Sequence, residues 1–448
     1  MCSILCSNLI KDDYDKYNFY LEKRGPDSTN TIKIGDYTFL HNLLSMTGDF
    51  VTQPFVENDI ICLYNGEIYN YKDYGSFKSD GECLIPMYKE FGDKFIKKLI
   101  GEFAIILFDL KNEKLIISSD IFKTKPLFYS TDGGNFGCST FCTPLEEAGH
   151  KNVIKMPPNT TRVFNLKSLE LIGEHSVYDF DLNQHKSTFD DWNVAFKNSI
   201  KRRTQDFSRK IFIGLSSGYD SGGICLELLN QNIPFKAYSV VGTENDEIFN
   251  YRWKCIENSN ISTYEKLHKS DDLYNKHHKY VLENVEKFQY TIDSVCPYTN
   301  QKTYTEYWNM SDDYGAKWLS YVCSHAKNDD RKMYLSGMGA DELFSDYGFR
   351  GTRFMKHSNF GGNFPDDLKS IFPWNSFYGS SMESYLAKEE YIGGSYGLEA
   401  RYPYLDVDVV QEFLWLSPEL KNSVYKSVID NYLEEHNFPF CKGEKRGF

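Results

Sequence analysis

Residues 215–223 constrain the fold of this chain more than any other segment. Residues 210–215 form a compact apolar run typical of a buried strand, residues 216–223 are mostly serine and glycine, and residues 224–229 have a helical apolar pattern. Small residues let the backbone approach an anion closely, and the amides at a helix N-terminus carry partial positive charge. The segment therefore predicts a phosphate-binding turn between a strand and a helix, in a domain that uses ATP.

The composition of this turn indicates how the phosphate is held. No Gly-Lys-Ser/Thr follows, so the turn differs from a Walker loop. The Asp220 carboxylate would repel a bare phosphate, which predicts an intervening Mg²⁺. The expected ATP and pyrophosphate ligands here are Leu215, Ser216, Ser217, Gly218, Asp220 and Ser221. The alternative is that the serines and Gly222-Gly223 only cap and bend a strand-to-helix connection.

A second segment repeats this arrangement. Residues 332–335 predict a short strand that leads into a glycine-rich turn with Ser336, Gly337 and Gly339, followed by Asp341 at a helix start. Two such turns at one edge of a parallel sheet form a crevice for a nucleotide and its metal. We expect Asp220 and Asp341 to be the metal ligands. The alternative is that Asp341-Glu342 only caps a helix.

Length and composition limit the class of protein. The chain has 448 residues, 41% of them hydrophobic, which is enough for two cores and predicts two domains. The formal net charge of −13 argues against a general electrostatic grip on nucleic acid. No apolar stretch is long enough for a bilayer, no signal peptide is recognisable, and the 11 cysteines include no C-x-x-C pair. These features predict a cytoplasmic protein without membrane or nucleic-acid partners.

The pattern along the chain divides it in two. Residues 1–180 show short strands at 37–44, 60–64, 103–110 and 114–118, interrupted by an amphipathic helix at 84–99, which predicts an α+β domain. A polar stretch at 181–188 follows. In residues 189–448 strands alternate with helices, beginning with a helix at 192–203, which predicts an α/β domain with a parallel sheet.

Seven ordered segments resemble the glutamine-hydrolysing asparagine synthetase family, and together they span nearly the whole chain. The N-terminal segments are Met1-Cys2-Ser3-Ile4, Arg24-Gly25-Pro26-Asp27, Asn65-Gly66-Glu67-Ile68-Tyr69-Asn70 and Ser79-Asp80-Gly81-Glu82. The C-terminal segments are residues 216–221, 336–344 and 397–406. The resemblance implies an N-terminal-nucleophile αββα sandwich followed by a parallel-sheet ATP pyrophosphatase domain of the PP-loop, adenine-nucleotide α-hydrolase-like type.

For the first domain, the resemblance implies a glutaminase site. Removal of Met1 would free the α-amine of Cys2 to act as base for its own thiol. The Asn65 side chain and the Gly66 N–H would stabilise the oxyanion, and glutamine would be bound by Arg24, Asn65, Glu67 and Asp80. The alternative for Cys2 is a packed N-terminal residue, the common fate of a lone cysteine.

For the second domain, the resemblance implies attack of a carboxylate on the α-phosphorus of ATP, followed by amidation with ammonia. Val240, on the second strand, joins the expected nucleotide-binding residues. Lys445, within Glu444-Lys445-Arg446-Gly447-Phe448, would neutralise charge on the phosphates as a catalytic residue. The alternative for Lys445 is one lysine in a solvated basic tail. Asp246-Glu247 is expected beside the site without a catalytic role.

Four positions depart from the family pattern. Leu43 replaces an arginine that would grip the glutamine carboxylate, Met338 replaces a glutamate, and Ser217 and Lys123 replace glycines. The leading hypothesis is an ATP- and Mg²⁺-dependent amidotransferase of asparagine biosynthesis, a ligase acting on small molecules and forming a homodimer. Leu43 and Met338 favour an amide-bond ligase of the β-lactam synthetase or lasso-peptide cyclase type. A nucleotide-binding regulator without activity is the third hypothesis.

Overall fold

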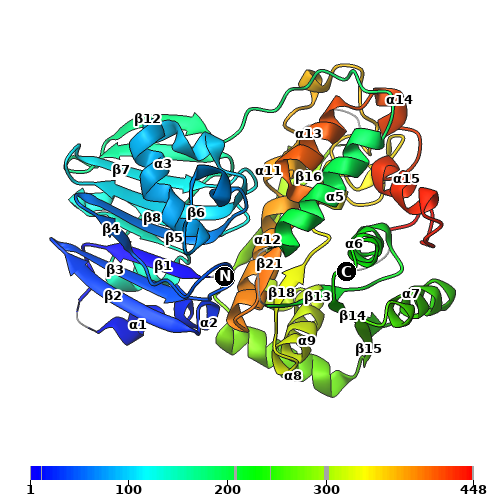
Figure 1. Ribbon diagram of the computed structural model, residues 1–448, viewed down its shortest axis with the longest axis horizontal. Coiled ribbons are helices and arrows are strands. Elements are labelled where there is room, and N and C mark those ends of the chain that lie inside the picture. The colour runs from blue at the N-terminus through cyan, green and yellow to red at the C-terminus, as the bar shows by residue number, and fades with distance from the viewer. Residues whose placement is uncertain (1, 12, 206–208, 243, 297–301, 446–448) are drawn as a thin grey trace.

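The structure is a computed structural model that describes residues 2–11, 13–205, 209–242, 244–296 and 302–445. Met1, whose removal the glutaminase hypothesis requires, and Arg446, Gly447 and Phe448 of the C-terminal motif lie outside the described residues. The model has a sandwich of two sheets in its N-terminal half and a parallel sheet flanked by helices in its C-terminal half (Figure 1).

The N-terminal half contains two six-stranded antiparallel sheets, as expected for an αββα sandwich. The first sheet has the order β10-β8-β9-β1-β3-β2, and its strands are β1 (Ser3–Ser7), β2 (Ser28–Ile34), β3 (Tyr37–Leu43), β8 (Phe128–Ser130), β9 (Gly137–Ser139) and β10 (Ile154–Lys155). The second has the order β12-β11-β7-β6-β5-β4, and its strands are β4 (Phe55–Glu57), β5 (Ile60–Ile68), β6 (Gly101–Asp109), β7 (Lys114–Ser119), β11 (Thr160–Asn165) and β12 (Leu171–Ser176).

Three layers of apolar side chains hold the sandwich together. Ile4 and Phe39 of the first sheet pack against Leu63 and Ile106 of the second, so the two sheets share an inner core. The outer face of the second sheet packs on α3 (Leu84–Phe91). The outer face of the first sheet contributes to a core with α1 (Tyr14–Asn18), α2 (Leu21–Arg24) and α4 (Thr143–Ala148). The observed layers confirm the predicted fold class of this half.

The helix predicted at residues 84–99 is shorter than expected. α3 ends at Phe91, and η3, a 3₁₀ helix (Gly92–Lys98), follows. Gly92 has φ +61°, a left-handed conformation that ends an α-helix and that glycine adopts at little cost. Phe95, Ile96 and Leu99 remain buried, so the apolar periodicity identified the core side chains correctly but not the backbone break.

The C-terminal half is built on a five-stranded parallel sheet with the order β15-β14-β13-β18-β21. Its strands are β13 (Lys210–Gly214), β14 (Phe235–Val241), β15 (Thr263–His268), β18 (Arg331–Leu335) and β21 (Glu399–Arg401). The major helices are α5 (Asp190–Thr204), α6 (Tyr219–Asn230), α7 (Asp246–Asn258), α8 (Asp271–Asn284), α9 (Tyr314–Asn328), α12 (Ser381–Ser395), α13 (Val407–Trp415) and α15 (Ser427–Glu435). This arrangement confirms the predicted α/β class.

Shorter elements complete the fold. Two hairpins pair β16 (Gln289–Val295) with β17 (Lys302–Asn309) and β19 (Gly348–Phe349) with β20 (Thr352–Arg353). The remaining helices are α10 (Ala340–Phe344), α11 (Asn375–Tyr378), α14 (Pro418–Lys421), η1 (Tyr71–Tyr74), η2 (Asp80–Cys83), η4 (Asp132–Gly134), η5 (Met310–Asp312), η6 (Leu368–Ser370) and η7 (Pro403–Leu405). Among the described residues, none of the helices is both long and apolar enough to cross a bilayer.

α12 and β21 lie between the two halves (Figure 1). Apolar contacts join them, for example Phe141 with Tyr391 of α12, whose ring centroids are 4.7 Å apart. Two carboxylates of α12 receive cations from the sandwich. Glu390 binds Arg24 and Lys125, each at 2.9 Å, and all three side chains are buried. These contacts make α12 the main structural link between the halves.

A second α12 carboxylate, Glu383, binds Lys123 at 2.7 Å and Lys155 at 3.1 Å. Lys123 stands where the family pattern has glycine, and its φ is +53°. The backbone therefore keeps the left-handed turn that glycine would provide, while the lysine side chain adds an ion pair to the interface. The departure from the family pattern at this position thus adds a contact between the two halves.

Candidate functional site

The two acidic turns of the C-terminal half meet in a cluster of four charged side chains. Lys426 Nζ lies 2.7 Å from Asp220 Oδ1 and 2.8 Å from Asp341 Oδ1, and Lys445 Nζ lies 2.6 Å from Asp341 Oδ2. Tyr425 donates a hydrogen bond to Asp341 over 2.9 Å. Residues from three distant parts of the sequence thus form one continuous network of ion pairs at the carboxyl edge of the parallel sheet.

The charges of this cluster depend on one another. Burial raises the pKa of Asp341, but Lys426 and Lys445 lower it more, so this carboxylate stays ionised. Burial raises the pKa of Asp220, and Lys426 offsets only part of that increase. Burial lowers the pKa of Lys426, but the two carboxylates raise it well above the usual value. Lys426 is therefore a fixed positive charge between two acids.

Close packing explains the glycines of the second turn. A Cβ on Gly337 would lie 2.8 Å from the Cβ of Asp220, so the two turns are in direct contact. Gly339 has φ +94°, and a Cβ there would lie 2.2 Å from Leu405. Ser336 accepts a hydrogen bond from Met338 N and donates its own N–H to Arg401 O over 3.0 Å. Ser336, Gly337, Gly339 and Asp341 thus lie against the first turn.

The first turn is held by its own side chains. Ser221 Oγ accepts a hydrogen bond from Ser216 N over 3.0 Å, and Ser216 Oγ accepts one from Gly218 N over 3.1 Å. Leu215 N donates to Tyr238 O of the neighbouring β14, whose carboxyl end carries Val240. Ser217 N and Oγ both donate to the Glu244 carboxylate. The predicted pyrophosphate ligands therefore lie together in an ordered turn.

Arg252 of α7 supports this turn from beneath. Its guanidinium donates to Ser216 O over 2.5 Å, to Gly218 O over 3.0 Å and to Pro439 O over 2.8 Å, and the side chain is fully buried. A Cβ on Gly222 would lie 2.4 Å from Arg252, which explains a glycine at that position. Because Arg252 holds the carbonyls inward, it orients the turn and joins it to the C-terminal segment.

The residues of this site include carboxylates of the kind that binds Mg²⁺. Proteins usually hold Mg²⁺ with one or two carboxylates, supplemented by phosphate oxygens and water. Asp220 and Asp341 converge on the Lys426 ammonium, which occupies that point in this structure, so a magnesium ion bound there would take the place of the ammonium. Among the described residues there is no group of three or more His, Cys, Asp or Glu side chains arranged for a metal, so further ligands would come from the nucleotide and water.

In the N-terminal half, Cys2 is buried directly before β1. Its thiol donates to Leu44 O over 3.8 Å, and its carbonyl accepts from Arg24 Nε over 3.2 Å. Burial raises the pKa of Cys2 to about 12. The thiol is therefore protonated in this structure, and a nucleophilic role requires a base that removes its proton.

Asn65 is a buried amide that lacks hydrogen-bond partners in the described part of the chain, at both Oδ1 and Nδ2. Leaving such a group unsatisfied costs about 1–3 kcal/mol, which is unusual unless a ligand or water uses it. The next residue, Gly66, has φ +144°, and a Cβ there would lie 2.0 Å from Glu102 O. Asn65 and Gly66 lie in β5, and β5 packs on β1, the strand that follows Cys2.

Glu67 and Asp80 each accept hydrogen bonds from other residues of the protein. Glu67 accepts from Thr47 Oγ1 over 2.6 Å and lies 3.1 Å from Arg401 of the C-terminal half. Asp80 accepts from Tyr64 OH over 2.5 Å and from Ile68 N over 2.8 Å, and burial raises its pKa to about 6. Asp80 thus braces the β5 segment that carries Asn65, and Glu67 lies at the interface between the halves.

Arg24 and Leu43 bear on glutamine binding. Arg24 is fully buried and binds Glu390 through its Nη2 and the Glu390 carbonyl through its Nη1, at 2.9 and 2.6 Å. Leu43 is a buried residue at the end of β3. The structure thus places Arg24 in the interface beside Cys2. Leu43, an apolar residue, occupies the position where the family pattern has arginine.

Four residues at these sites were missed by the sequence reasoning: Glu244, Arg252, Arg401 as a partner of Glu67, and Lys426. Lys426 directly precedes α15 with φ +50° and has no glycine-rich motif around it. Its only sequence signal is a lysine among apolar residues, which is also typical of a helix surface. Arg252 follows the site-adjacent Asp246-Glu247 by one and a half helical turns, so a search along α7 could have found it.

The comparisons with known proteins agree with this two-site organisation. Residues 1–155 match the family model described as a glutamine amidotransferase domain, and residues 191–389 match the one described as asparagine synthase. Asparagine synthetase (glutamine-hydrolyzing) of Mus musculus is 26% identical over 482 residues, which cover 93% of this chain and 76% of that protein. The Homo sapiens protein of the same name is 25% identical over 469 residues, 92% of this chain and 77% of that protein.

A solved structure of the allosteric regulatory enzyme of purine biosynthesis matches 48% of this chain and 60% of its own, with a TM-score of 0.32 and 13% identity. The two family models match in order along the chain, and both relatives align over more than nine-tenths of it. The chain therefore carries a glutamine amidotransferase domain followed by an asparagine synthase domain, and it is similar to glutamine-hydrolyzing asparagine synthetases over most of its length.

Proposed function

We propose that this protein is a glutamine-dependent amidotransferase that activates a carboxylate, aspartate or a related acid, as an acyl-adenylate and amidates it with ammonia from glutamine. Its family uses ATP, and the chain carries both domains that this reaction requires. The observation that carries the proposal is the cluster of Asp220, Lys426, Asp341 and Lys445, which joins both acidic turns to the C-terminal segment.

In the proposed synthetase step, a carboxylate oxygen of the substrate forms a bond to the α-phosphorus of ATP, and the bond to the bridging oxygen of pyrophosphate breaks. The first turn and Ser336, Gly337 and Gly339 would hold the phosphates. Lys426 and Lys445 would offset the negative charge that builds up on the leaving pyrophosphate. Asp220 and Asp341 would hold Mg²⁺, which screens phosphate charge when it is bound.

Ammonia would then attack the acyl carbon, and AMP would leave. Met338, at the place of the family's glutamate, cannot accept a proton from the incoming amine. We therefore expect another base, such as the departing phosphate or water, to take that proton. The replacement of glutamate by Met338 thus bears on the attack of ammonia and not on the adenylation step.

In the proposed glutaminase step, the Cys2 thiolate attacks the side-chain amide carbon of glutamine, ammonia leaves, and water hydrolyses the resulting thioester to glutamate. The Cys2 α-amine, exposed by removal of Met1, would take the thiol proton. The unsatisfied Asn65 amide and the Gly66 N–H would stabilise the oxyanion. Glu67 and Asp80 would face the glutamine ammonium, and Arg24 would hold the Cys2 main chain.

We propose domain limits at residues 1–180 and 189–448, a cytoplasmic location and a homodimeric assembly. The proposed partners are glutamine, ATP and a carboxylic acid, without nucleic acid or membrane.

The test is an assay of the purified protein with ATP, Mg²⁺ and glutamine, with and without aspartate or other carboxylic acids. Glutamate, AMP and pyrophosphate should form together when the correct acid is present. Cys2→Ala should abolish glutamine-dependent turnover and leave ammonia-dependent turnover intact. If no glutamate forms under any condition, the amidotransferase proposal is wrong.

A second candidate is an amide-bond ligase in which an amine of the substrate replaces ammonia. Buried Leu43 favours it, because an aliphatic side chain cannot anchor a glutamine carboxylate. Under this alternative, candidate substrates that carry both an amine and a carboxylate would support pyrophosphate release, and neither glutamine nor ammonia would change its rate. The same assay therefore separates the two candidates.

A further inference from the structure

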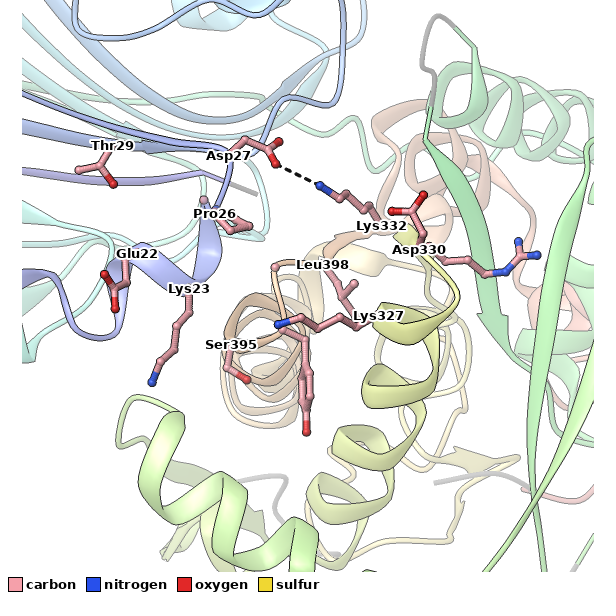
Figure 2. Close-up of a pocket in the computed structure, with 14 residues that line it drawn as sticks. Glu22, Lys23, Pro26, Asp27, Thr29, Lys327, Asp330, Lys332, Ser395 and Leu398 are labelled. Atoms are coloured by element: carbon pink, nitrogen blue, oxygen red, sulfur yellow. Dashed lines mark hydrogen bonds and ion pairs between the residues drawn. The ribbon is translucent and has the colours of Figure 1, made fainter.

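A cleft of about 630 Å³ opens between the two halves. One wall comes from α2 and the following turn, with Lys23, Pro26 and Asp27, and the other from α9, β18 and residues 395–398 (Figure 2). Arg331 and Lys332 begin β18, so the cleft lies at the amino edge of the parallel sheet. The Asp220 and Asp341 cluster lies at the opposite, carboxyl edge.

The lining of the cleft carries four cations and three carboxylates: Lys23, Lys327, Arg331, Lys332, Glu22, Asp27 and Asp330. Two of the carboxylates already face cations. Asp27 lies 3.1 Å from Lys332, as the dashed line in Figure 2 marks, and Asp330 lies 3.7 Å from Lys210 outside the cleft. Within the described residues, Glu22 is the one lining carboxylate without an ion-pair partner. Three lining cations remain besides Lys332, so the unpaired cations outnumber the unpaired carboxylate.

These three cations lack carboxylate salt bridges within the described residues. Lys23 Nζ is hydrogen-bonded to neutral Asn284 Oδ1 over 3.2 Å, and Arg331 Nη1 donates to the carbonyl of Ile211 over 2.7 Å. The buried Arg331 Nε has no hydrogen-bond partner among the described residues. Within the same part of the chain, the Lys327 side chain makes no hydrogen bond or ion pair, although the Lys327 carbonyl in the last turn of α9 accepts from Asp330 N. Figure 2 shows this side chain extending toward Ser395. The cleft therefore has an excess of positive charge.

We propose that this cleft binds a small dianion, a phosphate ester or a dicarboxylate, with Lys327 as its principal contact and Lys23 as a second contact from the opposite wall. The volume is within the roughly 300–1,000 Å³ of small-molecule sites, and such sites favour domain interfaces. Bound anion would offset the unbalanced charge of the two walls and link α2 to α9. The proposal concerns binding alone, so it does not depend on the amidotransferase function.

The walls of the cleft are continuous with segments that contact residues of the candidate glutaminase site. A Cβ on Gly397 would lie 3.0 Å from Pro26, so the two walls touch behind the cleft. Arg24, directly before Gly25 of one wall, donates to Cys2 O, and Glu399, directly after Leu398 of the other, bonds Arg401. An anion that fixes these walls would fix the segments beside Cys2 and Glu67.

Calorimetric titration with two probes, inorganic phosphate and succinate, tests the binding. We expect saturable binding of at least one probe, and at least a tenfold rise in its Kd in Lys327→Met and in Lys23→Met. Lys279→Met removes the same charge from the exposed face of α8, and its Kd should change less than twofold. The probe that binds identifies the source of the anion.

Hydrogen exchange supplies the second measurement, because it reports on the walls themselves. The bound probe should slow exchange in peptides covering residues 20–30 and 395–401 of the wild-type protein and leave Lys327→Met unchanged. Three results would overturn the proposal: no saturable binding of either probe, a Kd unchanged by both cleft substitutions, or an equal loss of affinity in Lys279→Met.

Discussion

Lys426 shows how one side chain can hold two acids together. It lies within 2.8 Å of Asp220 and of Asp341; Lys426 and Asp341 are buried, and Asp220 is partly exposed. Replacement by methionine would leave two neighbouring carboxylates with only Lys445 to offset their charge.

We expect Lys426→Met to lower the rate of adenylation by about 10²–10³-fold, the usual effect of removing one preorganised charge from a phosphoryl or acyl transfer site. Pyrophosphate exchange into ATP measures this rate directly, and glutaminase activity should persist. Lys442→Met is the control, because Lys442 is an exposed lysine near the same helix. A rate within threefold of the wild type would contradict the assigned charge role.

Arg252 is a second residue whose role follows from its contacts. A lysine at this position could not donate to Ser216 O, Gly218 O and Pro439 O at once, since only the planar guanidinium has the required fork of donors. Arg252→Lys should therefore loosen the first turn.

We expect Arg252→Lys to raise KM for ATP at least tenfold, in both glutamine-dependent and ammonia-dependent turnover, with little change in the glutaminase rate. Steady-state kinetics with either nitrogen donor measures it. Arg350→Lys is the control, because Arg350 is an exposed arginine that also donates to carbonyls. An unchanged KM for ATP would show that the turn keeps its conformation without the guanidinium.

At the scale of elements, α12 carries two carboxylates, Glu383 and Glu390, that bind cations of the sandwich. Glu383 receives Lys123 and Lys155 from the sandwich. Burial raises the pKa of Glu383, but these two lysines lower it further, to about 2 from the usual 4.5. Because the folded-state pKa is below the unfolded one, the ionised carboxylate stabilises the fold above pH 4.5, and this stability is lost as the pH falls toward 2.

The pH dependence of unfolding tests this contact. Glu383→Gln should lower the free energy of unfolding at pH 7, and its difference from the wild type should shrink as the pH falls below 4.5. Denaturant titrations between pH 3 and 7 give both values. Glu283→Gln, which removes an exposed carboxylate of α8, should show no comparable trend. A difference that stays constant down to pH 3 would exclude an ionised Glu383 as its source.

At the scale of the whole molecule, buried charge joins the two halves. Glu390 binds both Arg24 and Lys125, and its carboxylate also accepts from Tyr402 OH over 2.9 Å. Glu67 and Glu102 lie opposite each other on β5 and β6, a pairing of like charges that is unfavourable by itself. Arg401 and Arg203 of the C-terminal half offset them, at 3.1 and 2.9 Å.

Glu390→Gln would leave two buried cations without this carboxylate, at a cost of about 3–5 kcal/mol. We expect calorimetry to show the sandwich unfolding at a lower temperature, as a transition separate from that of the C-terminal half. Glu57→Gln, at an exposed pair with Lys89, should leave a profile like the wild type. A single transition at the wild-type temperature would mean that apolar contacts alone dock the halves.

The sequence by itself determined the local order of this protein. Strand and helix periods predicted an α+β half and a parallel-sheet half, because backbone conformation and side-chain period are properties of neighbouring residues. The family resemblance implied the αββα sandwich, and glycine and serine predicted two turns at one sheet edge. The apolar period also placed Phe95 and Leu99 in the core, but it could not show that Gly92 would adopt φ +61° and end the helix.

Only the tertiary structure decided which distant charges meet. It put Lys426 between Asp220 and Asp341, turned Arg24 toward Glu390, and brought Arg401 to Glu67. Nothing in the neighbourhood of these residues along the chain specifies such partners. A buried charge is costly unless an opposite charge lies next to it. Which opposite charge lies there depends on how the two domains pack, and that packing depends on the whole chain.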